Sequence, residues 1–311
     1  LEVNPDDDEA WYNRGYALDE LGRTEEAVAS YDRALEVNPD QDLAWNNRGY
    51  ALGKLGCYEE ALKSYDRALE VNPDHDLAWN NRGNALDELG RYEEAVASYD
   101  RALEVKPDKD EAWYNRGNAL RKLGRYEEAV ASYDRALEVK PDQDLAWNNR
   151  GNALDELGRT EEAIASYDRA LEVNPDHDLA WNNRGYALVN LSRYEEAVAS
   201  YDRALEVNPD DDLAWNNRGY TLGKLGCYEE ALKSFDRALE LKPDDFGAFC
   251  ARACIYARQN HLELALDSLK RAFQLNPDKS RQLVQTDTDF DELRNDPRFQ
   301  RLIENPEKQE S

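Results

Sequence analysis

Tryptophan recurs at a fixed interval of 34 residues along this 311-residue chain. The positions are Trp11, Trp45, Trp79, Trp113, Trp147, Trp181 and Trp215, and Phe249 stands at the next step. A fixed period of this length is typical of stacked supersecondary units, because each unit can bury its apolar face only against its neighbours. Length alone would suggest two domains. The period instead predicts one continuous stack without independent domains.

The segment 42–75 shows what one unit encodes. Apolar residues recur with helical spacing from Leu43, and Gly56 follows the last of them, where a helix can end in the left-handed conformation. A second apolar series starts at Tyr58 and stops before Pro73, which cannot continue a helix. Each unit is therefore predicted to be two helices joined by a tight turn.

The positions that recur from unit to unit carry a family resemblance, from which the last unit departs most. Counted from Asp42, the unit has Trp at position 4, Gly at 8, Leu at 11, Ala at 20 and 27, Tyr at 24 and Pro at 32. This pattern resembles the tetratricopeptide repeat (TPR), except that position 7 is Arg where the family usually has Leu. The resemblance implies an all-α fold, an α-solenoid in which eight helix-turn-helix repeats form a right-handed superhelix. It also implies that the first helix of each repeat lines the concave wall.

The resemblance divides the chain into three parts. Residues 1–7 match the end of a repeat, and we interpret them as the tail of a preceding truncated repeat. Residues 280–311 are expected to form a C-terminal capping helix and tail, with a final helix or helix pair at 290–303, because solenoid ends need a cap with a polar outer face. Between them lie eight repeats, 8–41, 42–75, 76–109, 110–143, 144–177, 178–211, 212–245 and 246–279.

Tryptophan and arginine are interpreted as structural residues. All seven tryptophans occupy one repeat position, which packing would produce and a ligand site would rarely need. Arg at position 7 accompanies Asp at position 25 in the first seven repeats, and a guanidinium can make two hydrogen bonds to a carboxylate. We therefore expect an Arg–Asp staple within or between repeats, with a phosphate or carboxylate ligand as the alternative. Arg252 would need another partner, because Lys270 replaces the Asp of its repeat.

Asparagine at position 6 is harder to explain by packing. Asn is a mediocre helix former, yet it holds this position in seven successive repeats. By family analogy the position points into the concave groove, where carboxamides free of internal duties would offer two donors and an acceptor each to peptide main chain. The alternative is that recent duplication of near-identical repeats carried the asparagines along.

Position 9 of the repeats completes the predicted site. It is either Asn or Tyr in the first seven repeats, and a tyrosine supplies contact area with a polar tip. The candidate peptide-binding residues are Asn13, Asn47, Asn81, Asn115, Asn149, Asn183 and Asn217 at position 6, and Tyr50, Asn84, Asn118, Asn152, Tyr186 and Tyr220 at position 9.

Charge and composition exclude several classes of function. The net charge of −27 argues against nucleic-acid binding, which needs a basic surface. No run of about 20 apolar residues occurs, so membrane insertion is not expected. Cys57 and Cys227 share one repeat position, and Cys250 and Cys254 lie one helical turn apart without the paired spacing of a zinc site. We therefore predict reduced thiols, a cytoplasmic location and no metal.

The sequence contains no nucleophile motif, phosphate loop or metalloprotease motif. We therefore predict that the chain is not an enzyme and needs no cofactor. The leading hypothesis is an interaction scaffold that binds an extended or helical peptide segment of an unidentified partner protein along the concave groove. The alternative is a structural module, either a homo-oligomer formed by end-to-end stacking or the regulatory arm of a larger multidomain protein.

Overall fold

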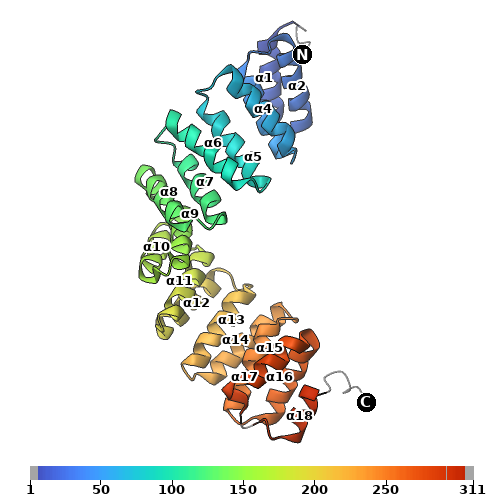
Figure 1. Cartoon of the computed structure of the whole chain (residues 1–311), viewed down its shortest axis with the longest axis vertical. Helices are drawn as coiled ribbons and strands as arrows, with labels where there is room; N and C mark the ends of the chain where they lie inside the picture. The colour runs from blue at the N-terminus through green and yellow to red at the C-terminus, as the bar shows by residue number, and fades with distance from the viewer. Residues whose placement is uncertain (1–5, 292, 305–311) are drawn as a thin grey trace. The chain divides into compact units, whose positions relative to one another are not determined.

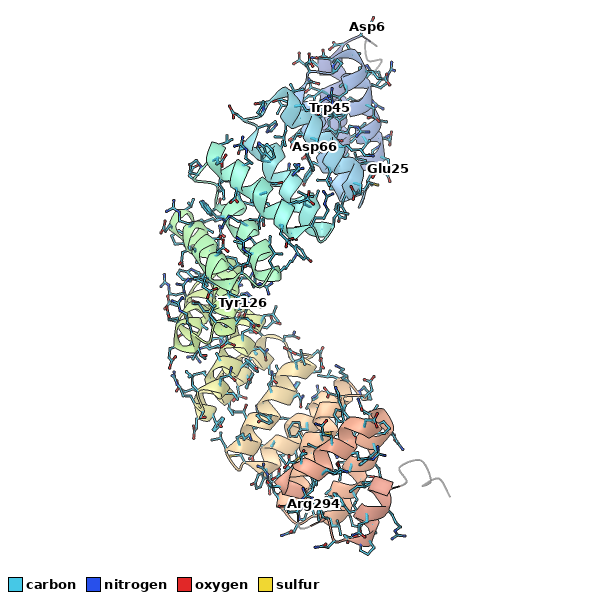
Figure 2. The ribbon with its side chains drawn as sticks, viewed as in Figure 1. Asp6, Glu25, Trp45, Asp66, Tyr126 and Arg294 are labelled. Atoms are coloured by element: carbon cyan, nitrogen blue, oxygen red, sulfur yellow. The ribbon has the colours of Figure 1, made fainter. Side chains whose placement is uncertain are left out.

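The computed structural model describes residues 6–291 and 293–304, and within these ranges all regular structure is helical (Figure 1). Figure 2 adds the side chains, and the labelled Trp45 and Asp66 belong to the second repeat. Residues 1–5 and 305–311, which the sequence assigns to a preceding repeat and to the C-terminal tail, lie outside the described residues. None of the described helices is long and apolar enough to cross a membrane.

The helices group into two compact units that meet between Arg159 and Thr160. The N-terminal unit contains α1 (Asp8–Glu20), α2 (Thr24–Val37), α3 (Asp42–Lys54), α4 (Tyr58–Val71), α5 (Asp76–Glu88), α6 (Tyr92–Val105), α7 (Asp110–Lys122), α8 (Tyr126–Val139) and α9 (Asp144–Glu156). The C-terminal unit contains α10 (Thr160–Val173), α11 (Asp178–Asn190), α12 (Tyr194–Val207), α13 (Asp212–Lys224), α14 (Tyr228–Leu241), α15 (Phe246–Arg258), α16 (Leu262–Leu275), α17 (Pro277–Thr286), the 3-10 turn η1 (Thr288–Phe290) and α18 (Pro297–Glu304).

The helix boundaries predicted for the second repeat are confirmed. Helix α3 ends at Lys54 and α4 ends at Val71, two residues before Pro73. Gly56 reverses the chain between them with φ at +75°, a conformation in which a side chain beyond Cα would be strained. The second helices begin with paired glutamates, which favour the positive end of the helix dipole.

Ser192 occupies the turn position that glycine holds in other repeats, with φ at +59°. An L residue in the left-handed region costs about 1–2 kcal/mol, which glycine avoids. Ser192→Gly is therefore expected to raise the free energy of unfolding by about 1 kcal/mol, measured by guanidinium denaturation. The reverse change at the matched turn, Gly124→Ser at φ +74°, should lower it by a similar amount. Equal stability of all three proteins would contradict this account.

The two helices of a repeat pack through a glycine and an aromatic ring. In the fourth repeat, a Cβ added to Gly117 would lie 2.6 Å from Cε1 of Tyr133, whose side chain is fully buried. The same contact recurs in other repeats, between Gly49 and Tyr65 and between Gly219 and Phe235. This close approach explains why position 8 is glycine in the first seven repeats. In the eighth repeat position 8 is Ala253 and position 24 is Leu269.

Successive repeats pack around tryptophan, so the structural interpretation of this residue is confirmed. Trp45 and Trp79 flank a buried cluster that includes Leu69. The indole Nε1 of Trp45 donates a hydrogen bond to the carbonyl oxygen of Pro39, 2.8 Å away, which ties α3 to the loop before it. The equivalent bond recurs at Trp79, Trp113, Trp147, Trp181 and Trp215.

Helices α17 and α18 and the turn η1 form a cap on the last repeat, and these elements differ from the predicted ones. Helix α17 begins at Pro277, inside the span assigned to the eighth repeat, because Asn276 caps it by accepting a hydrogen bond from the Lys279 amide at 3.0 Å. Of the predicted helix at 290–303, only the part from Pro297 forms α18, and Phe290 ends a 3-10 turn. Phe290 and Phe299 are fully buried against α16.

Candidate functional site

The first helices of neighbouring repeats contact one another directly. These contacts join α1, α3, α5, α7 and α9 in the N-terminal unit, and α11, α13 and α15 in the C-terminal unit. We call the surface that they share within each unit the first-helix face. It carries the residues of positions 6 and 9, so the repeat period places the predicted site residues of each unit on one continuous surface.

The position-6 asparagines bridge neighbouring first helices. Where a bond is resolved, the Nδ2 atom donates to position 5 or 9 of the preceding repeat. The bonds join Asn47 to Tyr12 Oη (3.1 Å), Asn81 to Asn46 Oδ1 (3.1 Å), Asn115 to Asn84 Oδ1 (3.0 Å), Asn149 to Tyr114 Oη (3.1 Å) and Asn118 Oδ1 (3.0 Å), and Asn217 to Asn182 Oδ1 (3.3 Å). Asn13, in the first described repeat, is exposed, and Asn183 is half-buried.

The expectation that these carboxamides are free of internal duties is therefore wrong. A half-buried amide must satisfy its polar atoms, and the short polar side chains of the preceding repeat lie within reach. The amides nevertheless keep unused capacity. The Oδ1 atoms of Asn81, Asn115 and Asn217 accept no bond from the described residues, and an amide that donates once keeps a second N–H.

At position 9 the two residue types have different roles. Asn84 and Asn118 each accept a 2.8 Å hydrogen bond, from the hydroxyls of Tyr99 and Tyr133. Burial raises the pKa of both phenols, so these asparagines satisfy hydroxyls that stay protonated. Asn152 is half-buried on α9.

The tyrosines of position 9 project from the surface instead. Tyr50, Tyr186 and Tyr220 are 51%, 53% and 50% exposed, whereas the tyrosines of the second helices at position 24 are buried. The first-helix face thus carries aromatic rings that the described chain leaves half-exposed. Exposed rings of this kind provide contact area with a hydrogen-bonding tip.

Charged pairs lie at the C-terminal ends of the first helices. Lys54 Nζ lies 2.8 Å from Asp19 and Lys122 Nζ lies 2.5 Å from Asp87. Each pair joins the first helices of two successive repeats. The hydrogen bond to Asp19 raises the pKa of Lys54. Carboxylates and ammonium groups therefore alternate, so the N-terminal unit presents a mixed rather than an acidic surface here.

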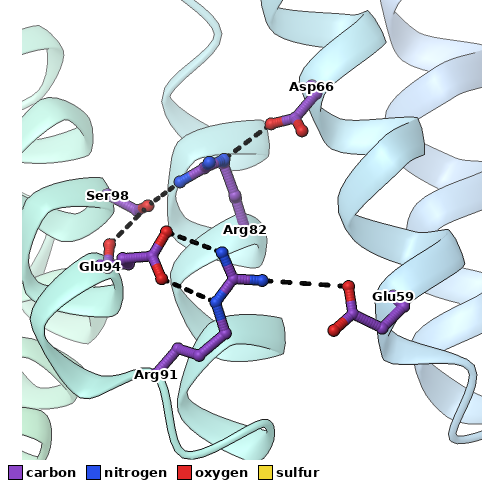
Figure 3. Close-up of polar contacts among 6 residues, drawn as sticks. All are labelled: Glu59, Asp66, Arg82, Arg91, Glu94 and Ser98. Carbon is purple, nitrogen blue, oxygen red and sulfur yellow. Dashed lines mark hydrogen bonds and ion pairs between the residues drawn. The ribbon is translucent and has the colours of Figure 1, made fainter.

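The Arg–Asp staple runs between repeats (Figure 3). Arg82 Nε donates to Asp66 of the preceding repeat at 2.8 Å, and its Nη1 donates to Ser98 of its own repeat at 2.7 Å. Ser98 in turn donates to the Glu94 carbonyl at 3.0 Å. The same Arg–Asp pairing occurs at Arg48–Asp32, Arg116–Asp100, Arg150–Asp134, Arg184–Asp168 and Arg218–Asp202.

The direction of the staple corrects one expectation. Because each arginine reaches back one repeat, Arg252 pairs with Asp236 at 3.1 Å and needs no substitute partner. Lys270 holds position 25 of the eighth repeat, and the aspartate of this position pairs with the arginine of the following repeat elsewhere in the chain. From Arg48 onward the position-7 arginines are thus occupied between repeats, which favours the structural interpretation over an anion ligand.

One cluster of potential metal ligands occurs among the described residues. Ligand atoms of Cys254, Asp287 and Asp289 lie within 4.8 Å of one another. Asp289 is already paired with Arg258 at 2.8 Å, and the Cys254 thiol lies 3.8 Å from Asp287. Burial raises the pKa of the Cys254 thiol, which opposes the thiolate that metal binding needs. The sequence analysis did not predict this cluster, because Asp287 and Asp289 belong to the cap, which lies outside the repeat pattern.

Comparisons with protein families cover most of the chain. Models described as tetratricopeptide repeat match residues 8–41, 46–112, 82–146, 114–178, 148–204, 182–246 and 246–279. A search of curated proteins with the sequence gives no match.

Solved structures show the same fold. The crystal structure of YrrB, a TPR protein with an unusual peptide-binding site, is 27% identical, with a TM-score of 0.53 over 60% of this chain and 96% of YrrB. MamA from Desulfovibrio magneticus is 22% identical, with a TM-score of 0.52 over 55% of this chain and 97% of its own. A TPR protein from Parabacteroides merdae is 21% identical, with a TM-score of 0.58 over 78% and 97% of the two chains.

Proposed function

The chain belongs to the tetratricopeptide repeat family, and we propose that it is a protein-interaction scaffold whose first-helix face binds a peptide segment of a partner protein. The observation that carries this proposal is the row of half-exposed tyrosines, Tyr50, Tyr186 and Tyr220, at one repeat position. Folding alone gives no reason to leave these rings half-exposed, whereas the tyrosines at position 24 of the second helices are buried. Tyrosine is also among the residues most enriched where proteins bind one another.

The amides beside these rings support a peptide as the ligand. An extended main chain presents one donor and one acceptor per residue, and the unused N–H groups and oxygens of the position-6 asparagines complement both. Each such hydrogen bond contributes only about 0.5–1.5 kcal/mol, so the affinity is spread over several repeats. The similarity to YrrB, which has a peptide-binding site, agrees with this class of ligand.

The proposal is tested by selecting ligands from a phage-displayed random peptide library on the purified chain. Affinities of the selected peptides are then measured for the wild type and for the Tyr50→Ala, Tyr186→Ala double variant. We expect the double variant to bind at least about 10-fold more weakly, because the first-helix face of each unit loses a half-exposed ring. Its free energy of unfolding should change by less than about 1 kcal/mol, since exposed side chains contribute little to folding.

The same two repeats provide a matched control. Tyr58 and Tyr194 begin the second helices α4 and α12 and so do not belong to the first helices. The Tyr58→Ala, Tyr194→Ala variant should retain the wild-type affinity for the selected peptides. If the selected peptides bind both double variants equally well, or if no peptide is selected, the first-helix face is not the binding surface.

A further inference from the structure

A cavity of about 310 Å³ opens in the C-terminal unit between α13, α15 and the cap. It lies at the lower end of the range of about 300–1,000 Å³ that is usual for ligand pockets. Its walls include Phe235, Ile255 and Leu283, and Tyr220 stands at its edge. The first-helix face, which carries amides in the earlier repeats, therefore ends in a largely apolar pocket.

The cavity exists because the eighth repeat departs from the others at the positions that face it. Position 5 is Cys250 in place of Asn or Tyr, position 6 is Ala251 in place of Asn, and position 9 is Cys254 in place of Asn or Tyr. Gly247 and Gly223 line the same space without side chains. Each change removes volume or polarity, so the amide row stops at Asn217 and leaves a space that one large apolar side chain can fill.

Four charged groups line this cavity, and three of them are engaged. Arg258 pairs with Asp289 at 2.8 Å. Asp287 accepts hydrogen bonds from the Asp289 amide at 2.9 Å and from the Cys254 thiol at 3.8 Å. Lys224 has neither an ion pair nor a hydrogen bond with the described residues, and its Nζ lies 5.0 Å from the centre of the Tyr220 ring.

The free ammonium group of Lys224 is an exception within the repeat pattern. Lys54 and Lys122 hold the same position and pair with Asp19 and Asp87 of the preceding repeats. The corresponding residue before Lys224 is Val189, which offers no carboxylate. One cation at the edge of the apolar cavity is thus left without an anion from the described chain.

We propose that this cavity is an anchor pocket for a partner protein's peptide segment in which a large apolar side chain stands next to a carboxylate. The apolar side chain fills the space between Ile255 and Leu283, and the carboxylate pairs with Lys224. This inference rests on the proposed function, because it treats the pocket as the end of the peptide-binding face. It adds a sequence requirement that the exposed tyrosines alone do not impose.

The distribution of isoleucine allows a direct test. The chain has three isoleucines, Ile164, Ile255 and Ile303, and only Ile255 lines the cavity. Selective labelling of isoleucine methyl groups on the full chain therefore gives one NMR signal from the pocket, and the Ile164 signal from α10 serves as an internal reference. The Ile255→Val variant assigns the pocket signal.

The probes are blocked tetrapeptides that differ at one position each. We expect Ala-Phe-Glu-Ala to shift the Ile255 signal and Ala-Phe-Lys-Ala to bind about 3- to 10-fold more weakly, because only the first supplies an anion for Lys224. Ala-Ala-Glu-Ala should bind about 10-fold more weakly or worse, because it lacks the apolar anchor. Free 4-phenylbutyrate should bind more weakly than Ala-Phe-Glu-Ala, because it lacks a main chain.

Variants separate the charge from the cavity. Lys224→Met should remove the preference for Glu over Lys in the probe, and the matched Lys122→Met, which changes the same repeat position in the N-terminal unit, should keep it. Ala251→Leu fills the cavity and should weaken both Phe-containing probes, while an unchanged Ile164 signal reports that α10 keeps its structure.

The proposal is overturned if Ala-Phe-Glu-Ala leaves the Ile255 signal in place, if the two Phe-containing probes bind equally well, or if Lys224→Met keeps the preference. It is also overturned as a peptide site if 4-phenylbutyrate binds as tightly as the tetrapeptide. If only the anchor-pocket proposal fails, the library peptides still bind in a way that depends on the tyrosines. If the scaffold hypothesis fails instead, the tetrapeptides still shift the Ile255 signal, but no library peptide depends on Tyr50 and Tyr186 for binding.

Discussion

Replacing Phe299 with alanine is expected to lower the free energy of unfolding of the C-terminal unit by about 3–5 kcal/mol. The ring is fully buried and stacks on Phe290, with ring centroids 6.0 Å apart. It belongs to a core that also contains Leu269 and Phe273 of α16. Alanine removes the buried ring and leaves a cavity that the short helix α18 cannot close by moving inward, because the rest of the core is already packed.

The position of Phe299 in the repeat stack increases the importance of this contact. Interior helix pairs are held by neighbours on two sides, whereas α16 depends on the cap for one of its two apolar contacts. Loss of the cap should therefore weaken the eighth repeat first. Guanidinium denaturation gives the overall effect, and hydrogen exchange of the α16 amides should show faster opening than that of the α12 amides.

Leu264 provides the control for the cap prediction. It lies on the same helix, α16, but its side chain is 47% exposed. Leu264→Ala should cost less than about 1 kcal/mol, because exposed residues contribute little to folding. If Phe299→Ala and Leu264→Ala destabilise the chain equally, the cap does not stabilise the last repeat.

The sequence predicts the helices of this chain well, because their boundaries depend on local chemistry. Gly56 and Pro73 end helices through restrictions on their own backbone, and these act wherever the residues stand. Trp45 is predictable as a packing residue for a different reason, since its recurrence reports the contact between repeats. Helix α17 was missed because the Asn276 cap resembles the loops that precede first helices in other repeats.

The partners of repeated polar residues are harder to predict, because they depend on the rotation between neighbouring repeats. Arg252 illustrates this dependence, since the sequence shows which residue types recur together but not whether the bond stays within a repeat. The asparagines of position 6 raise the same difficulty. Their side chains reach positions 5 and 9 of the preceding repeat because of the spacing between neighbouring first helices such as α3 and α5. No local sequence pattern specifies this spacing.

The pocket at the end of the first-helix face illustrates a third case. The departures of the eighth repeat at Cys250, Ala251 and Cys254 are visible in the sequence, and they would ordinarily suggest an end repeat under weaker constraint. Their significance appears only when Leu283 of α17 closes the other side of the same space. A cavity of this kind is formed by two segments together, so neither segment predicts it alone.

The triple variant Asn81→Ala, Asn115→Ala, Asn149→Ala is expected to lower the free energy of unfolding of the N-terminal unit by about 2–4 kcal/mol. Each replacement deletes at least one hydrogen bond between neighbouring first helices, and Asn149 makes two such bonds. The groups left behind include half-buried oxygens of the preceding repeat, which adds a desolvation cost. The higher helix propensity of alanine offsets part of the loss.

The same variant decides what the asparagines contribute to binding. The proposed function predicts that the selected peptides that bind the N-terminal unit of the full chain also lose affinity, by about 10-fold or more, because the unused amide groups pair with their main chain. Denaturation and peptide titration on the same protein separate the two effects. A loss of stability with unchanged affinity would show that the amides join the repeats and nothing else, which leaves the tyrosines as the binding residues. A loss of affinity with unchanged stability would mean that the bonds between repeats contribute no net free energy.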